Sequence, residues 1–287
     1  MKVCFGTVIY RQAKPFFKDL VGALSGQSYK DFDVLIANDN YDLNELSDMG
    51  VIDEAGKPWD LVDGLQGSVH FLNLQPLHLS IAQTRLHLIK EAKRLGYELL
   101  VIGDADDTFV PTRIENHWMG YKLDKRATFF YNELVTDKGE TVLYDLPDMV
   151  EDVRPVSQSN FLGMSTTSIN LTLVDEEWLD SLAEGDTAVF DWYFYSRMLM
   201  DIGYGRLVHD AATIYRIHEG NEVGVTHDPE QERSVKLIHY RNLAKRYPYF
   251  QHLYDDLSEL DLAGLDISHD HHGYWWSNII MEDSYEI

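Results

Sequence analysis

The chain has 287 residues, enough to bury a large core in one α/β domain with an appendage. Its 48 acidic and 24 basic residues give a formal net charge of −24, which argues against a nucleic-acid backbone or an anionic membrane as the main partner. The single cysteine, Cys4, excludes an internal disulfide framework and a cysteine metal site.

These features predict a soluble, cytoplasmic protein. A lone cysteine fits a reducing compartment, the N-terminus runs into strand-like sequence without a signal-peptide pattern, and no apolar run reaches the roughly 18–20 residues of a membrane-spanning helix. The negative charge also means that an anionic substrate needs a bridging cation or clustered basic side chains. Acidic residues grouped at one site would therefore indicate a divalent metal.

The start of the chain predicts a strand–helix–strand unit. Residues 3–10 are typical of a buried strand, apolar side chains between Phe16 and Leu24 recur at helical spacing until Gly26, and residues 33–37 give a second strand. In such a parallel arrangement, ligands bind beyond the carboxyl ends of the strands. Asp39, just after the second strand, lies at such an end.

The following segments lead to an acidic cluster. The glycine-containing residues 41–67 predict a loop insertion, residues 69–72 a strand, and residues 81–95 a helix that Gly96 ends. Residues 99–103 then form an apolar strand that runs directly into Asp104, Asp106 and Asp107, here called the acidic cluster. The cluster is thus expected at the carboxyl end of a buried strand.

The second half of the chain predicts antiparallel strands and further helices. Residues 127–135 and 141–144 flank an Asp-Lys-Gly turn and predict a hairpin, and residues 189–202 and 229–246 predict helices. After Arg246 there is no Lys or Arg, only an acidic and aromatic tail with several histidines.

The acidic cluster has a chemical interpretation of its own. Asp104 and Asp106 form an Asp-x-Asp pair whose carboxylate oxygens suit a hard cation, which leaves its other positions to a substrate diphosphate. In a donor-sugar reaction that cation neutralises charge on the leaving group. The alternatives are a solvated turn and carboxylates that cap a helix starting near Pro111.

Several blocks of sequence, taken in order, resemble glycosyltransferase family 2. The blocks are residues 6–11 leading to 27–34 and Asn38-Asp39, residues 81–85 leading to 101–107 and Pro111, the segment opened by Gly163, the pair Asp191-Trp192, and Tyr215-Arg216-Ile217-His218. They cover roughly the first 220 residues. The family usually has Glu-Asp where this chain has Phe190-Asp191, which puts the first acidic role in doubt and preserves the second.

The resemblance implies a GT-A fold, an α/β fold with a mixed, mainly parallel sheet flanked by helices over residues 1–220, and a C-terminal helical or irregular extension over residues 221–287. It implies a metal-dependent, inverting enzyme of the hexosyltransferase class that uses Mn²⁺ or Mg²⁺. The donor would be a nucleoside-diphosphate sugar, with a UDP-sugar favoured, and the pathway glycan or polysaccharide biosynthesis.

The acceptor is less defined than the donor. A glycan, a lipid-linked sugar or another hydroxyl compound all fit, and a lipid-linked acceptor would bring the protein to the membrane surface without an integral segment. The aromatic residues 274–276 are candidates for covering the acceptor site or for contacts within a homo-oligomer.

The same resemblance implies roles for individual residues on the nucleotide side. Asp39 would contact the nucleobase or ribose, with Thr7 and Tyr10 near it. Arg85 would reach the base or a phosphate, unless it is a solvated or salt-bridging helix residue. Arg216 would offset the charge of the diphosphate.

The remaining roles concern metal binding and transfer. Asp104 would contact both donor and metal, Asp106 and His218 would bind the metal, and Asp107 could share either role. Asp191 would be the general base, although a first-turn helix charge is the alternative. Trp192, beside it, would contact the acceptor sugar.

Two other functions remain open from the sequence. Residues 100–108 also fit a haloacid dehalogenase-like phosphatase with Asp104 as nucleophile and Asp106 as acid/base. That nucleophile normally ends the first strand of its domain, whereas strands with their own family-like motifs precede it here. The third hypothesis is a non-catalytic sugar-nucleotide-binding module that has kept the fold.

Overall fold

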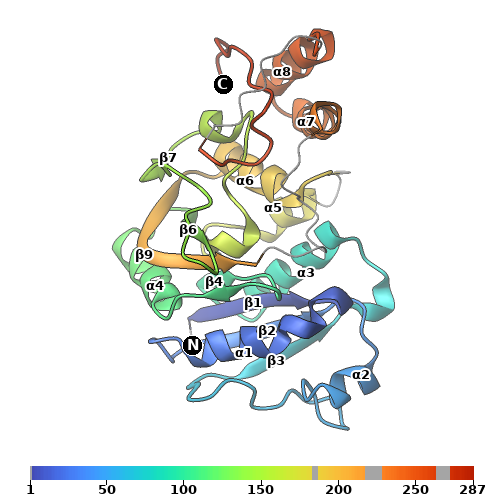
Figure 1. Cartoon of the computed structure of the whole chain (residues 1–287), viewed down its shortest axis with the longest axis vertical. Coiled ribbons are helices and arrows are strands. Elements are labelled where there is room, and N and C mark those ends of the chain that lie inside the picture. Colours follow the sequence, from blue (N-terminus) through green and yellow to red (C-terminus); the bar gives the residue numbers. More distant parts are fainter. Residues whose placement is uncertain (1, 183–186, 217–227, 263–271) are drawn as a thin grey trace.

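The computed structural model describes residues 2–182, 187–216, 228–262 and 272–287. Within them a mixed sheet of nine strands runs between helices in the order β3-β2-β1-β4-β8-β6-β9-β5, with β7 paired to β9 (Figure 1). The strands are β1 (Val3–Ile9), β2 (Asp33–Asn38), β3 (Val69–Asn73), β4 (Leu99–Ile102), β5 (Thr108–Phe109), β6 (Phe129–Thr136), β7 (Met149–Val150), β8 (Thr167–Asn170) and β9 (Gly205–Tyr215).

The parallel half of the sheet is formed by β1, β2, β3 and β4. Gly6 of β1 lies beside Leu35 of β2 and Ile102 of β4, so the three strands run in register and end at the same edge. Every residue of β2 and β4 is buried, as expected for strands covered on both faces. The residues that follow these strands are therefore brought together.

The sheet is mixed, as expected, but the expectation that it is mainly parallel holds only for the half formed by β1, β2, β3 and β4. β8 is antiparallel to both β4 and β6, β6 and β9 are parallel, and β9 is antiparallel to β5 and β7. The short 3-10 helix η4 (Met164–Thr166) lies beside Asp104 through Ser165 and leads directly into β8. Because β8 starts at the carboxyl end of β4, it must run in the opposite direction.

The predicted hairpin forms only in part. Gly139 makes the turn with a positive φ of 77°, and Thr141 returns to a single bridge with Val135 of β6. The chain then leaves β6, since the amide of Tyr144 donates instead to the carbonyl of His272 at 2.8 Å. Residues 141–144 are therefore no strand of the sheet.

The predicted helices are present, with additions. The α-helices are α1 (Phe17–Ser25), α2 (Leu43–Asp48), α3 (Ile81–Arg94), α4 (Arg113–Leu123), α5 (Glu176–Ser181), α6 (Phe190–Asp201), α7 (Pro229–Ala244) and α8 (Pro248–Glu259), and further 3-10 helices are η1 (Arg11–Phe16), η2 (Gln75–Leu77) and η3 (Arg154–Val156). Helix α2 interrupts the stretch predicted as a loop, and it begins at a capping box between Asp42 and Glu45.

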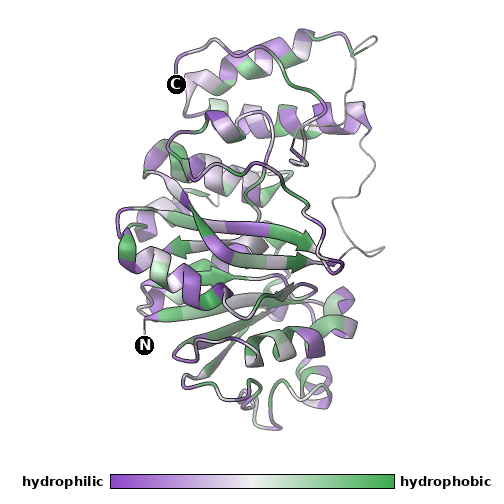
Figure 2. Ribbon diagram, turned by 60° about the vertical axis from the view of Figure 1, so that its left-hand side comes forward, coloured by the Kyte–Doolittle hydropathy of each residue, from purple (hydrophilic) through white to green (hydrophobic). Residues whose placement is uncertain are grey.

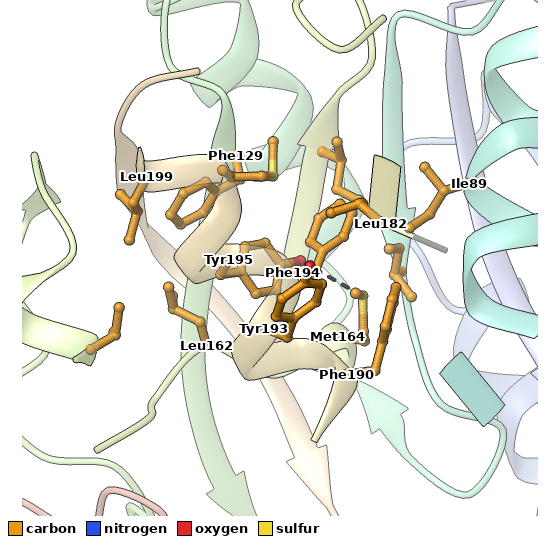
Figure 3. Close-up of a cluster of buried hydrophobic side chains, with 14 of the residues drawn as sticks. Ile89, Phe129, Leu162, Met164, Leu182, Phe190, Tyr193, Phe194, Tyr195 and Leu199 are labelled. Carbon is orange, nitrogen blue, oxygen red and sulfur yellow. Dashed lines mark hydrogen bonds between the residues drawn. The ribbon is translucent and has the colours of Figure 1, made fainter. Parts of the chain in front are cut away.

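Apolar side chains fill the space on both faces of the sheet. The ribbon coloured by hydropathy shows apolar segments in the strands, interrupted by polar segments in the long ones, and helices of mixed character (Figure 2). On one face α6 packs closely, with Tyr195 against Phe129 of β6 at a ring-centroid distance of 4.9 Å (Figure 3). The Tyr195 hydroxyl also points to the sulfur of Met164 at 3.8 Å. This cluster fixes η4 relative to α6.

Helices α7 and α8 pack on the α6 side of the molecule. The Trp192 indole of α6 stacks on His239 of α7, with ring centroids 4.1 Å apart. Glu232 and Lys236 of α7 form a buried ion pair of 3.0 Å, with side chains 1% and 0% exposed. The domain division at residue 220 stays a prediction. None of the described helices has both the length and the apolar character needed to cross a membrane.

Candidate active site

The acidic cluster lies directly beyond the carboxyl end of β4. Asp106 and Asp107 are buried, whereas the side chain of Asp104 is 33% exposed. Tyr10, which follows β1, donates its hydroxyl to Asp106 Oδ2 at 2.9 Å. The ends of β1 and β4 are thus joined at the predicted edge of the sheet.

Arg85 connects the acidic cluster to the predicted general base. Its Nη2 donates to Asp104 Oδ1 at 3.2 Å, and its Nη1 donates to Asp191 Oδ1 at 2.5 Å. Arg85 lies near the start of α3, and Asp191 lies in the first turn of α6. Two residues 106 positions apart in the sequence therefore meet at the end of β4. Arg85 is therefore salt-bridging, as one sequence alternative had it, but its partners are the two predicted site carboxylates.

The second oxygen of Asp191 is held by the backbone. The amide of Met164, the first residue of η4, donates to Asp191 Oδ2 at 3.1 Å. With Arg85 on one oxygen and the Met164 amide on the other, the carboxylate has a fixed orientation. Its side chain keeps 18% of its exposure, so it borders solvent.

Negative charge is crowded in the cluster. Burial raises the pKa of Asp104 to about 6, against the effect of Arg85 and with a further contribution from Asp106. Burial and the nearby Asp104 raise the pKa of Asp107 to about 8, although Ser165 donates to it at 2.6 Å. Raised carboxyl pKa values indicate that the protein leaves this charge incompletely compensated.

A buried arginine that no sequence motif indicated binds the backbone next to the acidic cluster. Arg113 is fully buried and donates through Nη2 to the carbonyls of Ile102 at 2.8 Å and Ser165 at 2.7 Å. Its Nε donates to Asn132 Oδ1 at 2.8 Å, and its guanidinium lies 4.5 Å from the ring centre of Phe109. The available signal was a basic residue only six positions after the cluster.

A neutral histidine completes this buried network. Because Asn132 Oδ1 already accepts from Arg113, His117 Nε2 must donate to it, at 2.8 Å, and Nδ1 must accept from Ser168, at 2.7 Å. Burial lowers the pKa of His117 to about 3, which is consistent with an uncharged ring. The end of β4, η4 and β8 are thereby held in one hydrogen-bonded unit.

Replacing Arg113 by Met is expected to lower the free energy of unfolding by about 3 kcal/mol, because several buried acceptors lose their donor. Urea denaturation followed by circular dichroism measures the change. The control is Arg126→Met, since Arg126 is 89% exposed and pairs with Asp124 only at 3.8 Å, so its loss should cost less than about 0.5 kcal/mol. Equal stabilities of the two variants would contradict the supporting role of Arg113.

Asp39 lies at the same edge, directly after β2. Its amide donates to the carbonyl of Ile9 at 3.1 Å, and its carboxylate accepts from Thr84 of α3 at 3.4 Å. Burial raises its pKa despite that hydrogen bond. Asp39, Tyr10 and the acidic cluster therefore border one region, as the strand order predicted.

Two predicted residues are placed in the core instead. Thr7 is 1% exposed, lines a small apolar cavity with Phe17 and Ile36, and its hydroxyl has no hydrogen-bond partner among the described residues. Trp192 is fully buried and donates its indole N–H to the carbonyl of Val156 at 2.5 Å. The structure does not bring either side chain to the cluster, which removes the basis for their predicted donor and acceptor contacts.

Of the motif Tyr215-Arg216-Ile217-His218, the structure describes the first two residues. The amide of Arg216 donates to Asp107 at 3.3 Å, whereas its guanidinium pairs with Asp19 of α1 at 2.8 Å and lies 4.5 Å from the ring centre of Phe16. His218, predicted as a metal ligand, lies outside the described residues.

The side chains at the end of β4 can be compared with the ligands that the predicted cation prefers. Among the described residues, no three His, Cys, Asp or Glu side chains are grouped so as to hold a metal ion. Asp104 and Asp106 nevertheless offer carboxylate oxygens, the ligand type that Mg²⁺ and Mn²⁺ prefer, and magnesium is commonly held by one or two carboxylates together with substrate phosphates. The pair therefore fits a cation that arrives with a diphosphate.

Comparison with known proteins gives the fold. No protein-family model and no curated protein matches the sequence. The structure of S. aureus TarS 1–349 in complex with UDP-GlcNAc matches with a TM-score of 0.59 at 13% identity, covering 92% of this chain and 77% of that one. TarS 1–349 alone gives 0.56 at 12%, with coverages of 90% and 71%. The chain thus has the same fold as TarS.

Proposed function

We propose that this protein is a metal-dependent, inverting glycosyltransferase that moves a sugar from a UDP-sugar to a hydroxyl acceptor. The observation that carries the proposal is the meeting of Asp104 and Asp191 on Arg85 at the end of β4. Inverting transfer needs the metal-binding carboxylate and the general base on opposite sides of one reacting carbon. Asp104 and Asp191 bind the same guanidinium, so both carboxylates belong to one site. The UDP-GlcNAc bound to TarS supports a UDP-sugar as the donor.

On the donor side, Asp39 and Tyr10 would bind the nucleoside, at the ends of β2 and β1. Asp104 and Asp106 would hold Mn²⁺ or Mg²⁺, and the cation would supply charge neutralisation for the departing diphosphate. Arg85 is a cationic side chain that contacts Asp104 directly, so it is also a candidate to pair with a phosphate. The crowded negative charge of the cluster would be relieved by such a cation.

On the acceptor side, Asp191 would take the proton of the acceptor hydroxyl as the hydroxyl oxygen attacks the anomeric carbon. The new carbon–oxygen bond forms on the face opposite the diphosphate, whose bond to the sugar breaks, and the configuration inverts. The Met164 amide holds one carboxylate oxygen of Asp191 and Arg85 holds the other, so both contacts orient the proposed base.

UDP is expected to stabilise the protein against heat in the presence of Mn²⁺, and to do so much less without it. At a ligand concentration of about 100 times Kd, the gain in unfolding free energy is about 2.7 kcal/mol. Thermal-shift measurements with UDP, GDP and ADP, each with Mn²⁺ or with EDTA, test this. The Asp106→Asn variant should lose the effect of Mn²⁺, whereas Asp60→Asn, an exposed acidic position, should keep it.

The same protein should release UDP from UDP-GlcNAc, slowly to water and faster to a sugar hydroxyl. Steady phosphate release from p-nitrophenyl phosphate without any nucleotide would instead support a phosphatase with Asp104 as nucleophile. UDP binding without any release of UDP from the donor would support a binding module. Failure of UDP to bind with any metal would contradict the proposed donor.

A further inference from the structure

A segment late in the sequence, residues 274–281, is fastened to the loop of residues 158–164. The backbones of Trp275 and Asn160 exchange two hydrogen bonds of 2.8 and 2.9 Å. The side chain of Gln158 likewise donates to the carbonyl of Met281 at 2.9 Å and accepts from its amide at 2.7 Å. The 274–281 segment therefore runs along this loop from one end to the other.

The buried ion pair of α7 holds the segment from its other side. Glu232 accepts from the amide of Ile279 and from the side-chain amide of Asn278, each at 2.8 Å. Lys236 donates to the carbonyl of Ile279. Buried charged groups that bond to one backbone stretch specify its position closely, so the 274–281 segment has a defined place beside the loop.

This arrangement puts an indole against Gly163, the residue that precedes the Asp191-binding amide. Two atoms of the Trp275 ring, Cη2 and Cζ3, lie 3.5 and 3.6 Å from the point where a Cβ of Gly163 would stand. Gly163 immediately precedes Met164, whose amide binds Asp191. Trp275 is half-buried, whereas its neighbour Trp276 is only 8% exposed. Trp275 is thus only partly covered, although it packs against the apolar core at the loop whose Met164 amide binds Asp191.

We propose that Trp275 is an acceptor-binding residue, whose partly covered indole stacks on the ring of a neutral sugar next to Asp191. A sugar ring presents C–H groups that pack on an aromatic face, and a rigidly held indole loses little freedom on binding. The carboxylates of Asp191 and the acidic cluster favour a neutral ring over an acidic one at this place. This inference rests on the proposed function and assigns its acceptor side.

The test measures UDP release from UDP-GlcNAc with Mn²⁺, in water alone and with methyl glycosides of the common hexoses and N-acetylhexosamines as probes. Wild-type protein should release UDP faster with at least one glycoside. The Trp275→Leu variant should raise the KM for that glycoside about tenfold, corresponding to the loss of one aromatic stacking contact. Release to water should stay within about twofold of wild type, and Trp275→Phe should recover most of the KM.

Tyr274→Leu is the matched control, because Tyr274 lies on the same segment but packs on Phe161, with centroids 4.8 Å apart. It should leave the KM for the glycoside unchanged. An unchanged KM in Trp275→Leu, an equal loss of release to water, or no acceleration of wild-type protein by any glycoside would overturn the proposal. Failure of the proposed function is a different result, since the wild-type protein would then release no UDP from UDP-GlcNAc, either to water or to a glycoside.

Discussion

Replacing Asp191 by Asn is expected to lower kcat for sugar transfer about 10²–10⁴-fold, the usual contribution of a general base. The amide has nearly the same shape and can still accept from the Met164 amide, but it cannot take the acceptor proton. The affinity for UDP with Mn²⁺, measured by calorimetry, should change less than about threefold, because the proposed role of Asp191 is to accept the acceptor's proton and not to bind UDP. Initial rates of UDP release with a saturating acceptor give kcat.

Asp180→Asn is the matched control for this prediction. Asp180 is a 72% exposed carboxylate on α5 that pairs with Lys90 at 2.7 Å, so the substitution removes the same charge and an ion pair that does not involve the acidic cluster. Its kcat should equal that of wild type. An Asp191→Asn variant with unchanged kcat, or one whose UDP affinity falls in parallel with its rate, would exclude Asp191 as the base.

Replacing Lys236 by Met is expected to lower the free energy of unfolding by about 3–5 kcal/mol. The change leaves the Glu232 carboxylate buried without its positive partner, and Glu232 is only 1% exposed. Transfer to an acceptor should also suffer more than UDP binding, because the pair fixes the 274–281 segment. Urea denaturation gives the stability, and calorimetry with UDP gives the donor affinity.

The double variant Glu232→Gln with Lys236→Met separates charge burial from packing. Without an isolated charge it should recover about half or more of the lost free energy, since Gln can still accept from Ile279. Lys90→Met, which breaks a surface pair, should cost less than about 1 kcal/mol. A double variant as unstable as Lys236→Met would show that the loss comes from the lysine's packing and not from charge.

The strands of the parallel half could be predicted because their chemistry is local. A strand buried on both faces is mostly apolar, and residues 34–37 and 99–102 show that pattern directly. Helix α2 could not be recognised by periodicity, since six residues give less than two turns, although the capping box of Asp42 and Glu45 was a usable signal. The direction of β8 depends on where η4 lies, which no local pattern states.

The site residues also divide into those that the local sequence predicts and those whose position depends on packing. Asp39 and the acidic cluster were predictable because they follow strands, and strand ends meet at one edge of the sheet. Thr7 was not, because a strand buried on both faces gives no indication of which side chains point to a site. Trp192 follows Asp191 by one helical residue and therefore points about 100° away from it, into the core. The contact of Arg85 with Asp191 requires the packing of α3 and α6.

The fastening of residues 274–281 to the 158–164 loop also affects how the protein is made. On the ribosome, the strands, the acidic cluster and Asp191 emerge well before Trp275 and Met281, and domains generally fold as units during synthesis. A nascent chain that ends before residue 275 holds the proposed donor side but lacks the partner of the loop that orients Asp191. We therefore expect nucleotide binding to appear earlier in translation than the capacity for transfer.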